Sequence, residues 1–172
     1  MKYYALLVVD VQEAITEGGH PHIIQTVQKI NDLIRFSKEK DIPIYYIRHI
    51  QEGSEFDLLA PTSRLSEHLL YLGNDVIIKH YKNAFKKTHL DTLLQAQKID
   101  TVIVVGFQTE YCVSSTIQGA HELGYDVLIP RECQNTFDRP KMTKEKILNK
   151  FFKQYPEFGK LVSFDELLKE LR

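Results

Sequence analysis

The sequence predicts a three-layer α/β/α domain of the Rossmann-like class, built around a mostly parallel six-stranded sheet. Short continuous apolar runs, which suit strands buried on both faces, alternate with segments whose apolar residues recur every three or four positions. Such regular alternation is typical of a parallel sheet covered by helices. No internal repeat, linker or low-complexity tract interrupts the pattern, so we expect residues 1–172 to form one domain.

The first strand is expected over residues 4–9, where Tyr-Ala-Leu-Leu-Val-Val forms an uninterrupted apolar run. A helix is expected over residues 22–40, because its apolar residues fall at helical spacing and Pro21 suits a first helical turn. Residues 42–47 are expected to form the second strand. The segment 51–63 is polar and contains glycine and proline, which indicates a loop.

A short amphipathic segment follows at residues 65–70, which contain three leucines. The third strand is expected over residues 75–79 (Asp-Val-Ile-Ile-Lys) and a helix over residues 90–98. The next apolar run, residues 101–105, predicts the fourth strand. Helical spacing then indicates a helix over residues 113–123.

Gly124 is expected to end that helix, because glycine readily adopts the left-handed conformation found after helix ends. Residues 126–129 and the short run 161–162 predict the fifth and sixth strands, with a helix over residues 143–152 between them. The segment Ser163-Phe164-Asp165-Glu166 is a capping box that opens a C-terminal helix.

Composition and charge exclude several classes of partner. Lys and Arg total 22 against 23 for Asp and Glu, so there is no basic surplus that would favour nucleic acid. No apolar stretch approaches the roughly 20 residues that span a bilayer, so no membrane partner is expected. The first residues lack the pattern of a secretory signal, and a cytoplasmic location is therefore expected. The two cysteines, Cys112 and Cys133, should then be reduced, and Cys133 should pack as a small apolar residue.

Cys112 is the most informative residue in the chain. It follows the expected strand at 101–105 and precedes the expected helix, which places a thiol at a strand-to-helix turn. Free backbone N–H groups and the helix dipole favour an anion there, so a depressed thiol pKa and a nucleophilic role are expected. A buried cysteine acting as a small hydrophobe is the alternative, and position alone does not decide between them.

Two other expected strands end in reactive residues. Asp10 follows the first strand, and Lys79 is the last residue of the third. The carboxyl ends of parallel strands meet at the edge of the sheet where ligands bind. Taken singly, Asp10 could be a turn residue and Lys79 a solvated strand end. A carboxylate, an ammonium and a thiol at three such positions together favour a catalytic site.

The order and spacing of several motifs then resemble a known family. These are Val8-Val9-Asp10-Val11-Gln12, Ile78-Lys79 with Ala84-Phe85, Gly106-x-x-Thr109-x-x-Cys112-Val113, and the following Thr116, Ala120 and Gly124-Tyr125-Asp126-Val127. The ordered set resembles the cysteine hydrolases of the isochorismatase-like superfamily. The resemblance covers nearly the whole chain, whereas one of these motifs alone would carry little weight.

The resemblance implies a catalytic triad of Asp10, Lys79 and Cys112. It also implies an oxyanion hole formed by the backbone N–H groups of Gln108 and Cys112, with a cis peptide bond between Phe107 and Gln108. In such a site the thiolate attacks a carbonyl carbon, the aspartate carries a proton to the leaving amine, and the resulting thioester is hydrolysed. A homo-oligomer, either a dimer or a tetramer, is expected by the same resemblance.

Departures from the family pattern narrow the expected chemistry. Nicotinamidases of this superfamily carry a metal site that includes an Asp-x-His pair after the second strand. The corresponding residues 46–50 contain no such pair, so neither a metal nor another cofactor is expected. Isochorismatases that cleave a vinyl ether typically lack the cysteine, so Cys112 favours an amide substrate. The family's frequent Ser-Ala-Phe and Asp-Ala are replaced here by Asn83-Ala84-Phe85 and Glu132-Cys133.

The predicted function is therefore cleavage of an amide C–N bond in a small molecule through a cysteine thioester. Gln12, Tyr81 and Phe107 are candidate substrate-binding residues, although each could instead serve packing. Glu110 could line the pocket or cap the helix that follows it, and the cap is the preferred interpretation. Two alternatives stay open: a vinyl-ether hydrolase that uses Asp10 as an acid, and a non-catalytic thiol redox or binding protein on the same fold.

Overall fold

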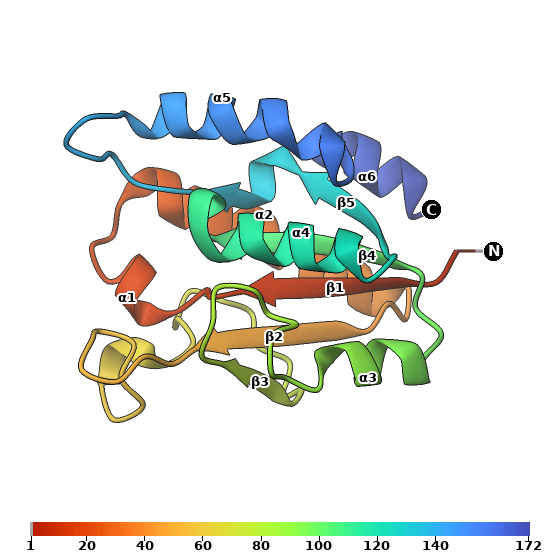
Figure 1. Cartoon of the computed structure of the whole chain (residues 1–172), viewed down its shortest axis with the longest axis horizontal. Coiled ribbons are helices and arrows are strands. Elements are labelled where there is room, and N and C mark those ends of the chain that lie inside the picture. The colour runs from red at the N-terminus through yellow and green to blue at the C-terminus, as the bar shows by residue number, and fades with distance from the viewer. Residues whose placement is uncertain (1) are drawn as a thin grey trace.

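The computed structural model describes residues 2–172 and has a parallel sheet at its centre (Figure 1). From one edge to the other, the sheet runs through β3 (Val76–Lys79), β2 (Ile44–His49), β1 (Tyr4–Val9), β4 (Thr101–Phe107), β5 (Asp126–Pro130) and β7 (Lys160–Val162). A further two-residue strand, β6 (Gln134–Asn135), pairs with the last two residues of β4. All these pairings are parallel, which confirms the predicted fold class.

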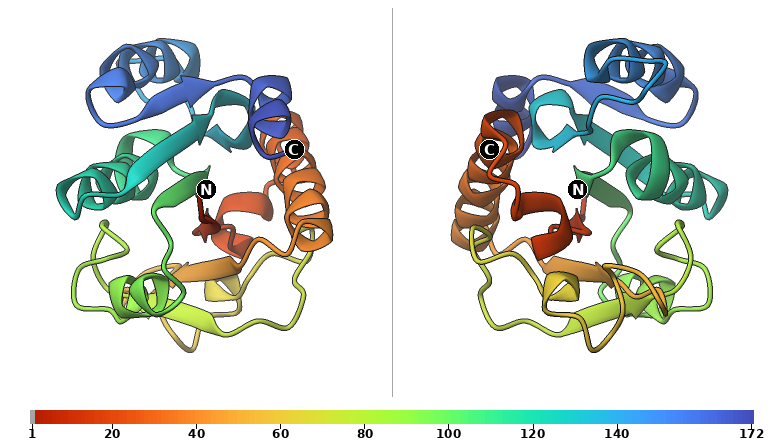
Figure 2. Two further views of the ribbon diagram at one scale, coloured as in Figure 1. Left: turned by 90° about the vertical axis from the view of Figure 1, so that its right-hand side faces the viewer. Right: turned by 90° about the vertical axis from the view of Figure 1, so that its left-hand side faces the viewer.

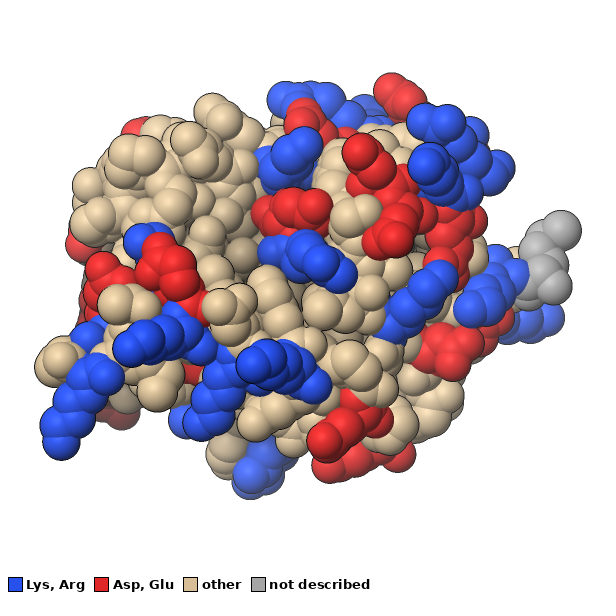
Figure 3. Space-filling view, turned by 90° about the horizontal axis from the view of Figure 1, so that it is seen from above, with Lys and Arg blue, Asp and Glu red and all other residues tan. Residues whose placement is uncertain are grey.

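The described residues contain six α-helices: α1 (Glu13–Thr16), α2 (Pro21–Glu39), α3 (Leu90–Ala96), α4 (Ser114–Glu122), α5 (Lys144–Gln154) and α6 (Phe164–Glu170). Shorter turns are the 3₁₀ segments η1 (Pro61–Ser63), η3 (Arg131–Cys133) and η4 (Tyr155–Glu157), and the π-helical turn η2 (Thr109–Val113). None of the helices in residues 2–172 is long and apolar enough to cross a membrane. Over α5 and α6, acidic and basic side chains are interspersed (Figure 3), in line with the net charge of −1.

Helices cover both faces of the sheet (Figure 2). Successive side chains of a strand point to opposite faces of the sheet. The apolar run of β1 is continuous because helices cover both faces. Leu7 and Val9 pack in the layer that includes α3, α4 and α5, whereas Leu6 and Val8 pack in the layer that includes α1, α2 and α6. Both faces of the strand are therefore buried, as the sequence predicted.

The element boundaries differ from the prediction where tertiary pairing extends a strand. β2 begins and ends two residues later than residues 42–47, so that His49 pairs in register with Lys79. Similarly, β4 continues through Phe107. The leucine-bearing segment 65–70 is not helical, and the short elements α1 and β6 were not predicted. The capping box at Ser163 is confirmed.

The strand ends meet at one edge of the sheet, where the arrowheads of β1 and β2 point in Figure 1. Asp10 directly follows β1, and Lys79 ends β3. The turn η2, which contains Cys112, follows β4 after a single residue. The fold therefore brings the three strand ends that carry chemistry to the same side of the molecule.

Gly106 allows β4 to pass close to β1. Its φ is +122°, and a Cβ at this position would lie 1.9 Å from the carbonyl oxygen of Val9, the residue before Asp10. We expect Gly106→Ala to lower the free energy of unfolding by roughly 2–5 kcal/mol, because it adds backbone strain and a clash with the neighbouring strand. Urea unfolding measures this loss.

Gly124→Ala is the matched control, because Gly124 has a φ of +89° but no atom within 4 Å of the added Cβ. We expect this variant to lose only the cost of the unfavourable backbone conformation. Equal losses in the two variants would show that backbone conformation alone, and not the approach to β1, requires glycine at position 106.

Candidate active site

The ammonium group of Lys79 lies at the centre of the site and is completely buried. It donates hydrogen bonds to Sγ of Cys112 (3.2 Å) and to the carbonyl oxygen of Tyr81 (3.1 Å). It also lies 3.1 Å from Oδ2 of Asp10 and 3.0 Å from Nδ1 of His49. Four acceptors thus surround a group with three protons, which offsets the cost of burying a charge. The structure therefore brings Asp10, Lys79 and Cys112 together.

Asp10 turns the chain at the end of β1. Its φ is +53°, in the left-handed region that aspartate tolerates better than most residues, and its backbone N–H donates to Ile47. The carboxylate is buried, and Oδ2 pairs with Lys79. Within the described residues Oδ1 has no hydrogen-bond partner. One oxygen is thus held by the ammonium, and the other is free to accept a proton.

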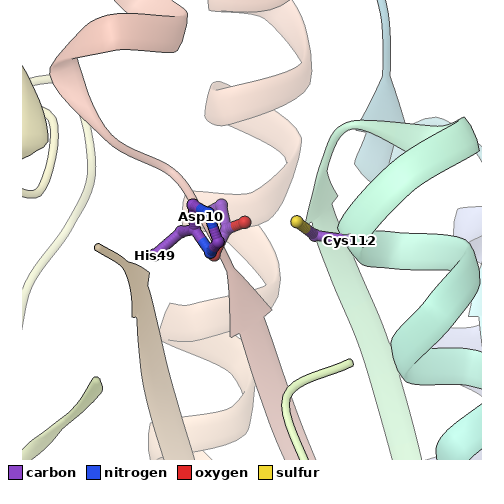
Figure 4. A group of neighbouring side chains, drawn as sticks. All are labelled: Asp10, His49 and Cys112. Carbon is purple, nitrogen blue, oxygen red and sulfur yellow. The ribbon is translucent and has the colours of Figure 1, made fainter. Parts of the chain in front are cut away.

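Cys112 lies in the π-helical turn η2, directly before α4. Its sulfur points toward Asp10 and His49 (Figure 4). Burial, and next the negative charge of Asp10, raise the pKa of the Cys112 thiol to about 12 against the opposing effect of Lys79. The predicted depression of this pKa is therefore wrong for the resting site. The resting state combines a neutral thiol with an Asp10–Lys79 ion pair.

We expect the rate at which iodoacetamide alkylates Cys112 to rise steadily from pH 6 to pH 10. Only the thiolate reacts, and a thiol pKa of about 12 lies above this whole range. Intact-mass spectrometry of samples quenched over time measures the rate, and Cys112→Ala identifies the labelled site. A rate that levels off between pH 6 and pH 8 would contradict the raised pKa.

His49 is a site residue that the sequence reasoning missed. It ends β2 opposite Lys79 and lines the cavity described below. Burial, followed by the charge of Lys79, lowers the pKa of the His49 imidazole, so the neutral ring accepts a hydrogen bond from the ammonium. The sequence offered little sign that His49 ends a strand, because the apolar run of this strand stops at residue 47. Pairing with β3 carries the strand to residue 49.

Asp10, His49 and Cys112 also form a set of potential metal ligands, with one ligand atom from each within 4.8 Å of the others. Carboxylate, imidazole and thiolate together suit a transition metal. The ammonium of Lys79, however, lies 3.0–3.2 Å from an atom of each of these residues. A metal ion bound by all three would have to displace a buried cation, so the arrangement fits an ammonium better than a metal.

A cavity of about 470 Å³ opens onto the thiol. Tyr81 and Phe107, two of the three predicted substrate-binding residues, line it together with Gln108 and Cys112. Its volume lies within the range of small-molecule sites. The peptide bond between Phe107 and Gln108 is cis, as the resemblance implied.

Gln12, the third predicted substrate-binding residue, is not among the residues that line the cavity. Its side chain is completely buried, and its amide nitrogen donates to the carbonyl oxygens of His49 (3.0 Å) and Ser63 (2.6 Å). Its amide oxygen accepts a hydrogen bond from the backbone N–H of His49 (2.8 Å). These contacts occupy the whole amide group, so Gln12 braces the end of β2.

Gln108 is held by side chains that sequence reasoning did not connect to it. Its side-chain oxygen accepts a hydrogen bond from Arg139 (2.5 Å), which also pairs with Glu110 (3.4 Å). The two carboxylate oxygens of Glu110 accept from the Thr136 hydroxyl at 2.6 and 2.7 Å. Glu110 therefore does not cap the helix as interpreted; it ties the start of η2 to the loop after β6.

The second cysteine is separate from the site. Cys133 is completely buried in the core on the α2 and α6 face, whereas Cys112 belongs to the opposite core. The predicted apolar packing of Cys133 is thus confirmed. The neighbouring Glu132 accepts a hydrogen bond from the backbone N–H of Phe164 (2.9 Å), which gives the lengthened acid a structural role.

The family model for the isochorismatase domain matches residues 4–163. The chain belongs to the isochorismatase family. Among its relatives is N-carbamoylsarcosine amidase of Arthrobacter sp, 28% identical over 74% of this chain and 58% of the relative. Maleamate amidohydrolase of Pseudomonas putida is 24% identical over 98% of this chain and 86% of the relative. The protein is a hydrolase of this family.

The fold of this isochorismatase-family protein is found again in a solved structure. The crystal structure of a cysteine hydrolase from Pseudomonas syringae pv. phaseolicola superposes with a TM-score of 0.91. The two are 23% identical, and the match covers 98% of this chain and 92% of the other. At that identity the likeness shows the fold alone.

Proposed function

We propose that the protein hydrolyses the C–N bond of a small amide through a thioester on Cys112. The observation that supports this most is that Lys79 Nζ contacts both Cys112 Sγ (3.2 Å) and Asp10 Oδ2 (3.1 Å) beside a small-molecule cavity. A nucleophile, a proton acceptor and a cation then lie within reach of one bound carbonyl group. The relatives named as an amidase and an amidohydrolase support the same reaction class.

In the first step, Sγ of Cys112 bonds to the amide carbon while the thiol proton passes to Asp10. The transfer accompanies the attack because the resting thiol, with a pKa of about 12, is protonated. Lys79 stabilises the negative charge that builds up on sulfur. The carbonyl electron pair moves onto oxygen, and the backbone N–H groups of Gln108 and Cys112 are assigned to receive this oxyanion.

In the second step, the oxyanion reforms the carbonyl group and the C–N bond breaks. The leaving nitrogen takes the proton from Asp10 and departs as ammonia or an amine, which leaves a thioester. Water then attacks the thioester carbon, and Asp10 takes its proton. Collapse of this second oxyanion releases the acid product, and the sulfur recovers the proton from Asp10.

The test is a panel of primary and N-substituted small amides, together with isochorismate, with and without EDTA. We expect ammonia or amine release from at least one amide, at a rate that EDTA does not change, because Lys79 holds the position between the potential metal ligands. Turnover of isochorismate alone, undiminished in Cys112→Ala, would instead support the vinyl-ether mechanism with Asp10 as the acid. Turnover that EDTA abolishes would contradict the ammonium-centred site.

A further inference from the structure

Arg139 contacts the cavity-lining residue Gln108 from outside the cavity. Its Nη2 donates to the side-chain oxygen of Gln108 at 2.5 Å and lies 3.4 Å from Oε1 of Glu110. Gln108 lines the cavity, whereas Arg139 and Glu110 are not among the lining residues. Arg139 also lies over the ring of Tyr111, which lines the cavity, at 5.1 Å from its centroid. Any effect of Arg139 on the reaction therefore acts through the residues that it contacts.

The position of the Arg139 guanidinium is set by the chain around it. The backbone N–H of Arg139 donates to the carbonyl oxygen of Met142 (2.8 Å), and its carbonyl oxygen accepts from the N–H of Met142 (3.2 Å). Glu110 is held in turn by the Thr136 hydroxyl. The side chains of Arg139 and Glu110 are 36% and 10% exposed, so solvent screens their ion pair less than a fully exposed one. The guanidinium thus approaches Gln108 from a fixed point.

Gln108 is held at its backbone and at its side chain. Its carbonyl oxygen accepts hydrogen bonds from the N–H groups of Tyr111 (3.0 Å) and Val113 (3.3 Å) in η2. Its side-chain oxygen accepts from Arg139, and the Thr136 hydroxyl lies 3.4 Å from the same oxygen. Rotation about the backbone bonds of Gln108 would break one of these two sets of contacts. The orientation of its backbone N–H therefore depends on Arg139 as well as on η2.

We propose that Arg139 and Glu110 are positioning residues that hold Gln108 so that its backbone N–H meets the oxyanion. This inference deepens the proposed function and rests on it. A displacement of about 1 Å in such a site can cost on the order of 100-fold in rate. Stability alone explains Arg139 less well, because its Nε is buried without a hydrogen-bond partner within residues 2–172, which costs free energy.

The first experiment measures amide hydrolysis in Arg139→Ala, Gln108→Met and the double variant. Gln108→Met keeps the backbone N–H and loses only the side-chain acceptor that Arg139 holds. We expect each single variant to lose about 10- to 100-fold in kcat, with KM of Arg139→Ala within about threefold of the wild type. The double variant should lose no more than the larger single loss, because both changes break the same contact.

Two further variants complete this experiment. Glu110→Gln removes the counter-charge of Arg139, so kcat should fall in the same direction by a smaller factor. Arg35→Ala is the matched control, because Arg35 pairs with Asp32 (2.9 Å) on the exposed surface of α2 and should keep the kinetics of the wild type. Circular dichroism confirms that each variant is folded.

A second experiment does not depend on turnover and uses butyraldehyde as the probe. Sγ of Cys112 bonds to the aldehyde carbon, the carbonyl electron pair moves onto oxygen, and the thiol proton passes to that oxygen. The resulting hemithioacetal places its oxygen where the oxyanion would lie, so butyraldehyde should slow the alkylation of Cys112 by iodoacetamide. Alkylation itself breaks a C–I bond and needs no oxyanion donor. The charges that shift the pKa of Cys112 are those of Asp10 and Lys79, so removing Arg139 should leave the thiol equally reactive.

We expect Arg139→Ala to weaken protection by butyraldehyde about tenfold, with the alkylation rate in its absence within about threefold of the wild type. 1-Butanol cannot form the adduct and should protect neither protein. Protection that weakens in this way without hydrolysis of any amide would refute the proposed function and leave the positioning role standing. Unchanged protection in folded Arg139→Ala would overturn the positioning role, whether or not amides are hydrolysed. Losses in kcat that multiply in the double variant would overturn it as well.

Discussion

Replacing Cys112 with alanine is expected to lower kcat for amide hydrolysis by at least about 10³-fold without loss of the fold. The reason is that, in the proposed mechanism, Sγ supplies the bond through which the acyl group is held, and no other thiol lines the cavity within the described chain. Steady-state ammonia release measures the loss, and circular dichroism confirms that the variant is folded.

Cys133→Ala is the matched control for this experiment. Cys133 is also a buried cysteine, but it lies in the core on the opposite face of the sheet. We expect this variant to lose some stability and to keep its activity per folded molecule. Activity of Cys112→Ala within about tenfold of the wild type would instead point to a reaction in which Asp10 acts without the thiol.

Replacing Lys79 with methionine is expected to abolish activity and to lower the free energy of unfolding by about 3–5 kcal/mol. Methionine has a similar length but no charge, so Asp10 would stay buried without its partner. The hydrogen bonds to Cys112 and Tyr81 would be lost as well. Urea unfolding at pH 7 measures the loss of stability.

The double variant Asp10→Asn/Lys79→Met separates the two effects. It removes both charges, so we expect it to recover more than half of the stability lost in Lys79→Met and to stay inactive. Asp10→Asn alone should also be destabilised, because it leaves the ammonium without its counter-charge. If the stability loss of the double variant equals the sum of the losses in the two single variants, this would contradict a buried ion pair between these residues.

The positions of the three central residues could be predicted because they depend on local pattern and on one rule of topology. The apolar runs before Asp10, through Lys79 and before Cys112 mark buried parallel strands, and the carboxyl ends of such strands share one edge. The capping box at Ser163 could also be predicted, because its two residues, Ser163 and Glu166, lie within four positions of the chain.

The remaining site residues depend on contacts between distant segments. His49 reaches the site because β2 continues along β3 beyond its own apolar run. Gln12 has the chemistry of a ligand-binding amide, but partners 37 and 51 residues away use that amide for structure. Arg139 contacts Gln108 only because the loop after β6 returns to the site.

The direction of the Cys112 pKa shift also depends on contacts that the local sequence does not reveal. The helix start is a local feature that favours the thiolate, and Lys79 favours it as well. Burial and the approach of Asp10 arise from tertiary packing, and they outweigh those features. The consequence is chemical, because a thiol that is protonated at rest needs a proton acceptor during the attack, and the unpartnered oxygen of Asp10 can fill that role.

The most direct test of the central claim is to capture the acyl group on Cys112. The protein is mixed with an amide that it turns over, quenched in acid between milliseconds and seconds, and analysed by intact and peptide mass; a parallel reaction contains hydroxylamine. We predict an acyl adduct on the peptide that carries Cys112, and hydroxamate formed in place of part of the acid product. Full turnover with neither an adduct nor a hydroxamate would contradict a thioester mechanism.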